Sequence, residues 1–194
     1  KLGNGTDYLR SNFSCFFQKT IRLGIFMVKK RQRHLLIIGG GVFQVPAIKV
    51  AKSMGLKVVV TDYNVDAEGM LIADYPIEVS TRNINLTVNA AKQFHSSCPL
   101  DGVMTVGTDA SQTVAAVANA LSLPGIPFEV AERSTDKIKM RRRLDEMGIA
   151  VPNYKPVWTI DDLNTAIEEM PLPLVIKPCD NMGARGVKMI SGSD

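Results

Sequence analysis

The spacing of apolar residues in the first half of the chain predicts alternating strands and helices. Residues 35–38 are all apolar, and residues 39–41 are three consecutive glycines. From residue 42 to residue 54 the apolar side chains recur at helical spacing, and Gly55 favours a helix end there. Residues 57–61 read as a second strand. A strand, a glycine turn, a helix and a strand in this order form the βαβ unit of a doubly wound parallel sheet.

The same alternation continues up to a proline-containing crossing. Residues 76–79 and 102–106 predict further strands, and residues 85–94 and 110–121 predict helices. His95 follows one of these helices, where we interpret it as a helix-end or surface imidazole. The segment 123–128 holds two prolines and a glycine, which favour a boundary. We therefore expect residues 35–130 to form one α/β domain with a parallel sheet.

Beyond this boundary the pattern predicts a smaller unit that ends in a hairpin. A helix from about residue 134 to Gly148, capped by Ser134 or Thr135, is followed by an expected strand at 155–159. Residues 159–162, Thr-Ile-Asp-Asp, open a second helix with an acidic capping arrangement. Residues 174–176 and 187–190 then read as two strands that enclose a glycine-containing loop.

The loop of this expected hairpin has the composition of a phosphate-binding segment. Lys177 ends the first strand, and Gly183 and Gly186 flank Arg185. Glycine lets backbone N–H groups converge on an oxyanion, lysine adds a point charge and arginine adds a planar fork. The alternative is an ordinary glycine-containing hairpin with two solvated cations. These residues alone do not separate the two interpretations.

The order of residues 173–187, Pro-Leu-Val-Ile-Lys-Pro-Cys-Asp-Asn-Met-Gly-Ala-Arg-Gly-Val, resembles the ATP-grasp superfamily. Within it, the loop is most similar to those of carbamoyl-phosphate synthetase and of carboxylate–amine ligases. A second resemblance is Asp136-Lys137 at a helix start, with Gly-Ile-x-Val-Pro after the helix. The resemblance covers residues 35–194. It implies a Rossmann-like domain at 35–130 and the first part of an ATP-grasp subdomain at 131–194.

The resemblance also implies an activity and a set of site residues. In such ligases a carboxylate takes the γ-phosphoryl group of ATP, and an amine or similar nucleophile then opens the acyl phosphate. The implied substrates are thus a small carboxylate and an amine, with ATP and Mg²⁺ as cofactors. The expected ATP-binding residues are Lys137, Lys177, Asn181, Met182, Gly183, Ala184, Arg185 and Gly186. The expected substrate-binding residues are Gly39, Gly40, Gly41, Thr108 and Asp109, of which the last two are also candidate helix caps.

Metal ligands and catalytic residues are not expected within this sequence. In the superfamily the Mg²⁺ ligands would come after Asp194, so we interpret the chain as part of a longer enzyme or a degenerate product, inactive alone. Two alternatives stay open. One is an NAD(P)-dependent oxidoreductase, based on the glycines at 39–41 and Asp62, although Gln44 is a poor fit to the dinucleotide fingerprint. The other is a non-catalytic nucleotide-binding or dimerising module.

Charge, hydropathy and cysteine content bear on whether the chain binds nucleic acid, spans a membrane or forms disulfides. The net charge is +4, yet residues 34–194 carry 15 basic and 18 acidic side chains, which gives little support for nucleic-acid binding. No apolar run approaches the ~20 residues that span a bilayer. The three cysteines are scattered, as expected for free thiols in the cytoplasm. We expect residues 1–34 to be a poorly ordered extension, with 1–26 dispensable, and a homodimer to form through the Rossmann-like domain.

Overall fold

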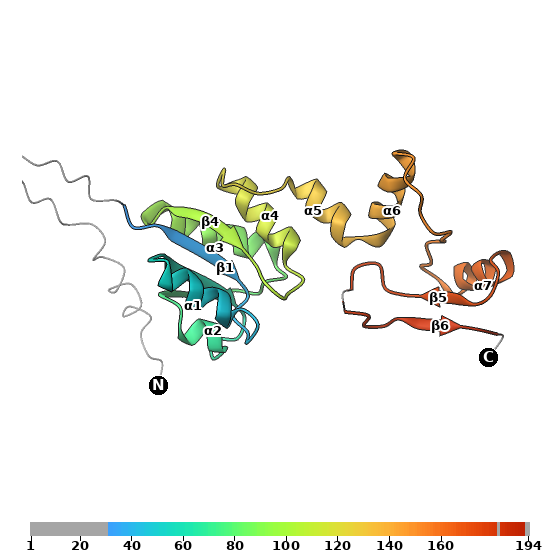
Figure 1. Ribbon diagram of the computed structural model, residues 1–194, viewed down its shortest axis with the longest axis horizontal. Coiled ribbons are helices and arrows are strands. Elements are labelled where there is room, and N and C mark those ends of the chain that lie inside the picture. Colours follow the sequence, from blue (N-terminus) through green and yellow to red (C-terminus); the bar gives the residue numbers. More distant parts are fainter. Residues whose placement is uncertain (1–30, 182, 193–194) are drawn as a thin grey trace, which may run out of the picture.

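The computed structural model describes residues 31–181 and 183–192 as two α/β regions joined by a helix (Figure 1). We call residues 31–120 the sheet region and residues 137–192 the hairpin region. The elements are β1 (His34–Ile38), α1 (Val45–Ser53), β2 (Lys57–Asp62), α2 (Glu68–Leu71), β3 (Tyr75–Glu78), α3 (Ile84–Ser97), β4 (Leu100–Met104), α4 (Ser111–Ala120), α5 (Phe128–Thr135), α6 (Lys137–Glu146), α7 (Ile160–Glu169), β5 (Leu174–Ile176) and β6 (Lys188–Ile190).

The four strands of the sheet region form a parallel sheet in the order β3-β2-β1-β4. This confirms the predicted α/β class and the βαβ unit at its start. The fourth strand runs from Leu100 to Met104 rather than over 102–106, so residues 105–109 form the loop after it. Because all strands are parallel, the loops after β1 and β4 meet at the same edge of the sheet, where ligands bind in open α/β folds.

Apolar side chains fill both faces of this sheet. Leu36, Ile38 and Val59 pack with buried residues of α3 and α4 on one face. Ile37, Val58 and Val60 pack with α1 and α2 on the other face. Successive strand residues point to opposite faces, so fully apolar runs such as 36–38 and 58–60 are what a strand covered on both sides requires.

Asp74, just before β3, joins the start of β2 to the end of α1. Its carboxylate accepts hydrogen bonds from Lys57 Nζ at 2.7 Å and from the Val58 N–H at 3.0 Å, and Lys52 Nζ lies 3.5 Å away. Burial alone would raise the pKa of Asp74, but these hydrogen bonds and the lysine charges lower it below the usual value. The hydrogen bond to Asp74 in turn raises the pKa of Lys57.

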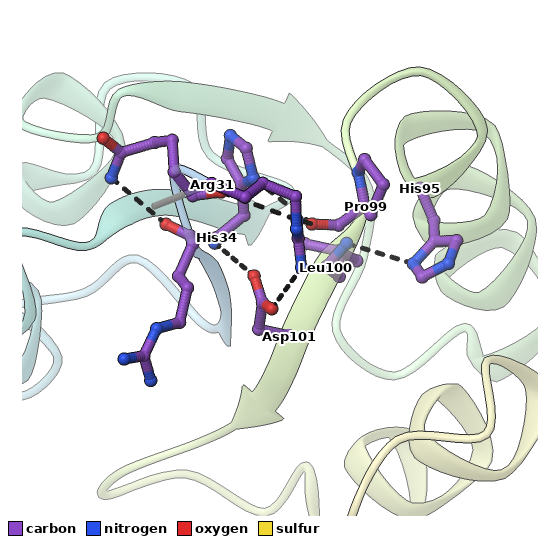
Figure 2. Close-up of polar contacts among 8 residues, drawn as sticks. Arg31, His34, His95, Pro99, Leu100 and Asp101 are labelled. Atoms are coloured by element: carbon purple, nitrogen blue, oxygen red, sulfur yellow. Dashed lines mark hydrogen bonds and ion pairs between the residues drawn. The ribbon is translucent and has the colours of Figure 1, made fainter. Parts of the chain in front are cut away.

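A polar network closes the opposite, amino-terminal edge of the sheet (Figure 2). Asp101 accepts a hydrogen bond from the His34 N–H at 2.8 Å and forms an ion pair with Arg31. His34 is buried, and its Nδ1 lies 3.2 Å from the Pro99 carbonyl oxygen. His95 Nδ1 accepts a hydrogen bond from the Leu100 N–H at 3.1 Å, which confirms the interpretation of His95 as a helix-end residue.

Beyond α4 the chain differs from the sequence-based expectation at three places. Helix α5 was not predicted, and it contacts both α4 and α6. The cap of α6 is Asp136, which accepts hydrogen bonds from the N–H groups of Ile138 and Lys139, rather than Ser134 or Thr135. The strand expected at 155–159 is wrong: these residues pair with neither described sheet, and Pro156 lacks an N–H for a ladder.

The remaining elements of the hairpin region follow the prediction. Thr159 and Asp162 form the capping box that opens α7, and the N–H groups of Trp158 and Thr159 together with the Thr159 hydroxyl lower the pKa of Asp162. β5 and β6 are antiparallel, with Val175 directly opposite Met189. In Figure 1 the loop end of this hairpin points toward the sheet region.

The expected N-terminal extension, residues 1–34, lies partly outside the described residues and partly in the sheet. The expected disorder and dispensability of the N-terminal extension fall on residues 1–30, which lie outside the described residues. His34, which the prediction assigned to that extension, is the first residue of β1. Within residues 31–181 and 183–192, no helix combines the length and apolar character that a bilayer crossing requires.

Candidate functional site

Lys137 lies against the start of the loop between β5 and β6, which we call the glycine loop (residues 179–186). Asp136 caps α6 and thereby makes Lys137 the first helical residue. The Lys137 N–H donates to the Cys179 carbonyl oxygen at 3.0 Å. Its ammonium donates to the carbonyl oxygens of Cys179 and Asn181 at 3.2 and 2.7 Å. The structure thus brings together two predicted site segments that are about forty residues apart in sequence.

The end of the glycine loop folds back on the residue that precedes the loop. Gly186 has a φ of +76°, and a Cβ there would lie 2.9 Å from Cγ of Pro178, so both the backbone angle and the space require glycine. Gly183 and Ala184 also have positive φ angles, of 67° and 57°. Met182 lies outside the described residues. These angles make residues 183–186 a tight turn, and successive backbone N–H groups in a turn can bind an anion.

One face of the hairpin is exposed and combines apolar side chains with a cation. Val175 and Met189 are opposite each other and 59% and 70% exposed. Lys177, two residues beyond Val175, is also exposed, whereas the alternate residues Leu174 and Ile176 are partly buried. Since side chains alternate along a strand, Lys177 extends the face of Val175 and Met189. Lys188 pairs with Ile176 and belongs to the alternate set.

In the sheet region, two of the three glycines predicted to bind substrate have a structural reason to be glycine. Gly39 has a φ of +99°, and its N–H donates to the Thr61 carbonyl oxygen at 2.8 Å. The Gly40 carbonyl oxygen accepts from the Gly69 N–H at 2.6 Å, so the end of β1 and the start of α2 touch through backbone atoms. A Cβ on Gly40 would lie 2.9 Å from Met70 Cγ. Gly41 is the least confined of the three.

Gln44 closes the space between the loops after β1 and β4. Its side chain is 4% exposed, and its amide donates a hydrogen bond to the Val106 carbonyl oxygen. A Cβ on Gly39 would meet the Gln44 side chain at 3.3 Å. The neighbouring acid is also engaged: Asp62 accepts from the N–H groups of Gly40 and Asn64 at 2.8 and 2.9 Å. Gln44, the residue that does not fit the dinucleotide fingerprint, therefore occupies the space beside Gly39 with its own side chain.

Asp109 connects this edge of the sheet to the glycine loop. It was a candidate cap of the following helix together with Thr108, but the residue at the cap position of α4 is Ala110, without a side-chain cap. The capping interpretation is therefore wrong. Instead, Asp109 Oδ2 accepts a hydrogen bond from Arg185 at 2.7 Å. Nothing in the sequence pattern indicated this contact, which joins the two predicted sites directly.

Known proteins match the sheet region by sequence and most of the chain by structure. Residues 16–122 match the family model "Alanine dehydrogenase/PNT, C-terminal domain". Alanine–anticapsin ligase of Bacillus subtilis is 31% identical over 96 residues, which are 48% of this chain and 20% of that protein. The L-amino acid ligase of Bacillus licheniformis is 26% identical, with a TM-score of 0.65 over 84% of this chain and 40% of that one.

Further structural neighbours have the same fold. N5-carboxyaminoimidazole synthetase of Staphylococcus aureus, in complex with ADP, has a TM-score of 0.67 over 84% of this chain and 42% of its own, at 22% identity. The chain spans about two fifths of the length of these structures. The chain therefore belongs, over residues 16–122, to the alanine dehydrogenase/PNT C-terminal domain family, and its sequence relatives and structural neighbours are ligases of the ATP-grasp superfamily.

Proposed function

We propose that this chain is the N-terminal, nucleotide-binding part of an ATP-dependent ligase that activates a small carboxylate as an acyl phosphate for attack by an amine. The observation that carries the proposal is the position of the Lys137 ammonium against the glycine loop that begins just after Lys177. Lys137 lies against the loop, Lys177 precedes the loop by two residues in sequence, and together with the turned backbone they offer positive charge and N–H donors. A polyphosphate is the ligand that such a combination suits.

The hairpin face gives the proposal a place for the rest of the nucleotide. Val175 and Met189 offer an exposed apolar surface continuous with Lys177. A purine base has a flat apolar face, and methionine contacts aromatic rings favourably. We assign the base to Val175 and Met189 and the phosphates to Lys177, Lys137 and residues 181–186 of the glycine loop.

For the acid substrate we propose the edge of the sheet at Gly41, Thr108 and Asp109. The contact between Asp109 and Arg185 brings that edge next to the glycine loop, as a carboxylate that receives a phosphoryl group would require. No residue of this chain is assigned a catalytic role. The transfer of a phosphoryl group depends mainly on position and charge neutralisation, and the groups named here bind and orient.

We assign to this chain the binding of the nucleotide and of the acid substrate, and we assign it no metal ligand. Among residues 31–181 and 183–192, no group of three or more His, Cys, Asp or Glu side chains is placed to hold a metal ion. Magnesium enters the proposal only as the cation that accompanies ATP in the whole enzyme. We also propose that the protein is cytoplasmic and forms a homodimer through the sheet region. A non-catalytic nucleotide-binding module is the alternative to the ligase.

The family match favours a second candidate, an NAD(P)-dependent oxidoreductase, but the geometry does not suit the dinucleotide. In a dinucleotide-binding domain the glycine turn must leave its backbone open to a pyrophosphate, and the acid after the second strand must reach a ribose hydroxyl. Here Gln44 covers Gly39, and Asp62 binds the N–H groups of Gly40 and Asn64. We therefore favour the ligase.

Calorimetric titration of the 194-residue chain tests this assignment. We expect ATP to bind more tightly than adenosine, with a Kd no better than about 1 mM, roughly −4 kcal/mol, because the ligands for phosphate are exposed. Binding should weaken as salt is added. Lys177→Met should weaken ATP binding, while Lys188→Met, which removes the same charge from the alternate set of hairpin residues, should have little effect. The chain alone should release no phosphate from ATP above background.

NADH is the control ligand. If the ligase assignment is correct, it should bind no better than other phosphate compounds. Tight NADH binding, combined with ATP binding that is indifferent to Lys177→Met, would contradict the ligase and support the oxidoreductase. Equal affinity for ATP and adenosine would contradict the assignment of phosphates to the lysines and the loop.

A further inference from the structure

Arg185, the fork-shaped cation of the glycine loop, is bound by a carboxylate of the sheet region. Arg185 and Asp109 are 76 positions apart in sequence, and their side chains meet at 2.7 Å. The Asp109 side chain is 28% exposed and the Arg185 side chain 62%. This ion pair links two residues that sequence analysis assigned to different ligands, one to ATP and the other to the substrate.

We propose that Asp109 competes with the phosphates of the nucleotide for Arg185 and thereby couples the edge of the sheet to the nucleotide site. This inference rests on the proposed function. Carboxylate and phosphate oxygens bind the same guanidinium N–H groups, and both do so best in the plane of the fork. While Asp109 Oδ2 binds Nη2 of Arg185, a phosphate that uses this nitrogen must displace the carboxylate, so Asp109 is a positioning residue that lowers the affinity of the glycine loop for polyphosphate.

The other contact of the glycine loop does not depend on Asp109. Lys137 binds the carbonyl oxygens of Cys179 and Asn181 at the loop entry, and α6 carries Lys137. Gly186, at the far end, folds against Pro178 within the hairpin region itself. Removal of the Asp109 charge therefore removes the carboxylate that binds Arg185 and leaves these two contacts of the loop in place.

Loss of the Asp109 carboxylate should cause a small increase in the affinity for polyphosphate. An exposed ion pair adds only modest stability, and the Arg185 side chain is largely exposed. Loss of the competing carboxylate should raise polyphosphate affinity by about two- to fivefold. The gain should shrink as salt screens the pair. A structural role for Asp109 would give the opposite sign, since loosening the loop would weaken binding.

Calorimetry with inorganic tripolyphosphate and with ADP tests the sign on the full chain. Asp109→Asn should tighten both ligands, whereas Asp66→Asn, which removes an exposed carboxylate from the same region, should not. Arg185→Gln should weaken both ligands. In the Arg185→Gln background, Asp109→Asn should have no further effect, because the cation for which it competes is gone. Adenosine, which carries no phosphate, should be indifferent to all four variants.

A second measurement detects the ion pair without any ligand. Trypsin must bind the Arg185 guanidinium to cut after this residue, so Asp109→Asn, which removes the competing carboxylate, should speed cleavage of the Arg185–Gly186 bond about two- to fivefold, in proportion to the exposed pair that is lost. Asp66→Asn should not. Unchanged cleavage in Asp109→Asn would overturn the inference, as would tripolyphosphate binding that Arg185→Gln weakens but Asp109→Asn fails to tighten. Binding to neither wild type nor any variant would overturn the proposed function itself, and the inference with it.

Discussion

The sheet region and the hairpin region both contain apolar strands, yet they bury them to very different degrees. In β1, Leu36, Ile37 and Ile38 are fully buried between helices on both faces. In the hairpin, Val175 and Met189 are more than half exposed. No residue of α6 is buried either. The same apolar strand pattern is thus buried in the sheet region, where it stabilises the fold, and exposed in the hairpin region, where we propose that it contacts the base of the nucleotide.

The strongest way to break this comparison is to shorten one side chain in each region. Ile37→Ala should destabilise the chain by about 2–5 kcal/mol, since it removes buried methylene groups and leaves a cavity. Val175→Ala should change stability by less than about 0.5 kcal/mol, because that side chain is already in water. Chemical denaturation of both variants measures the difference. Equal losses would mean that the hairpin face is packed in solution.

A pair of glycines sharpens the comparison at the level of the backbone. A Cβ on Gly69 would lie 2.6 Å from the Gly40 carbonyl oxygen, so Gly69→Ala should push α2 away from the end of β1 at a cost of about 1–3 kcal/mol. Gly192→Ala in the hairpin region meets nothing within 4 Å and should be nearly neutral. Thermal unfolding of the two variants checks this. If Gly69→Ala is neutral, the close approach of α2 to the glycine turn is not rigid.

The smallest expected effect is the pH dependence from Asp74. Its pKa is lowered in the folded state, so its stabilising contribution is complete above the ordinary aspartate pKa of about 4 and is lost as pH falls through the lower folded value. Asp74→Asn should cost about 1 kcal/mol at pH 7, a modest value because both lysine partners are substantially exposed.

Urea denaturation at several pH values measures this contribution. The gap between wild type and Asp74→Asn should close progressively below about pH 4, as Asp74 of the wild type is protonated and loses the charge that the asparagine variant never carries. Asp66→Asn serves as the matched control and should show no comparable gap at pH 7. A gap that persists at pH 2 would indicate that the asparagine disrupts packing rather than charge.

Most of the fold could be predicted because its signals are local. The buried runs in β1 and β2, the glycine turn and the capping box at Thr159 each depend on a few neighbouring residues, and the structure has all of them. The strand predicted at 155–159 failed because a strand needs a partner as well as a pattern, and no described strand pairs with it. Helix α5 was missed because the two prolines at 124 and 127 suggested only a crossing.

The candidate site shows the same limit more sharply. The residue types at Lys137, Lys177 and the glycine loop were recognisable from sequence, and the contact between Lys137 and Cys179 brings two of these segments together. The ion pair of Asp109 with Arg185 was not predictable, because it depends on how two regions face each other. The sequence showed that Gln44 does not fit the dinucleotide fingerprint. Only the structure shows that its amide binds the Val106 carbonyl oxygen.

Asp136 ends α5 and begins α6 as a single extended residue, with φ of −96° and ψ of 113°. A change in the backbone angles of Asp136 would rotate α6 relative to α5. Helix α6 has ten residues, so it is about 15 Å long, and a rotation of about 10° at Asp136 would carry its far end by about 2.6 Å. Lys137 sits at the pivot and would scarcely move. A rotation at Asp136 would therefore change the position of the far end of α6 relative to the sheet region and leave Lys137, at the start of α6, nearly in place.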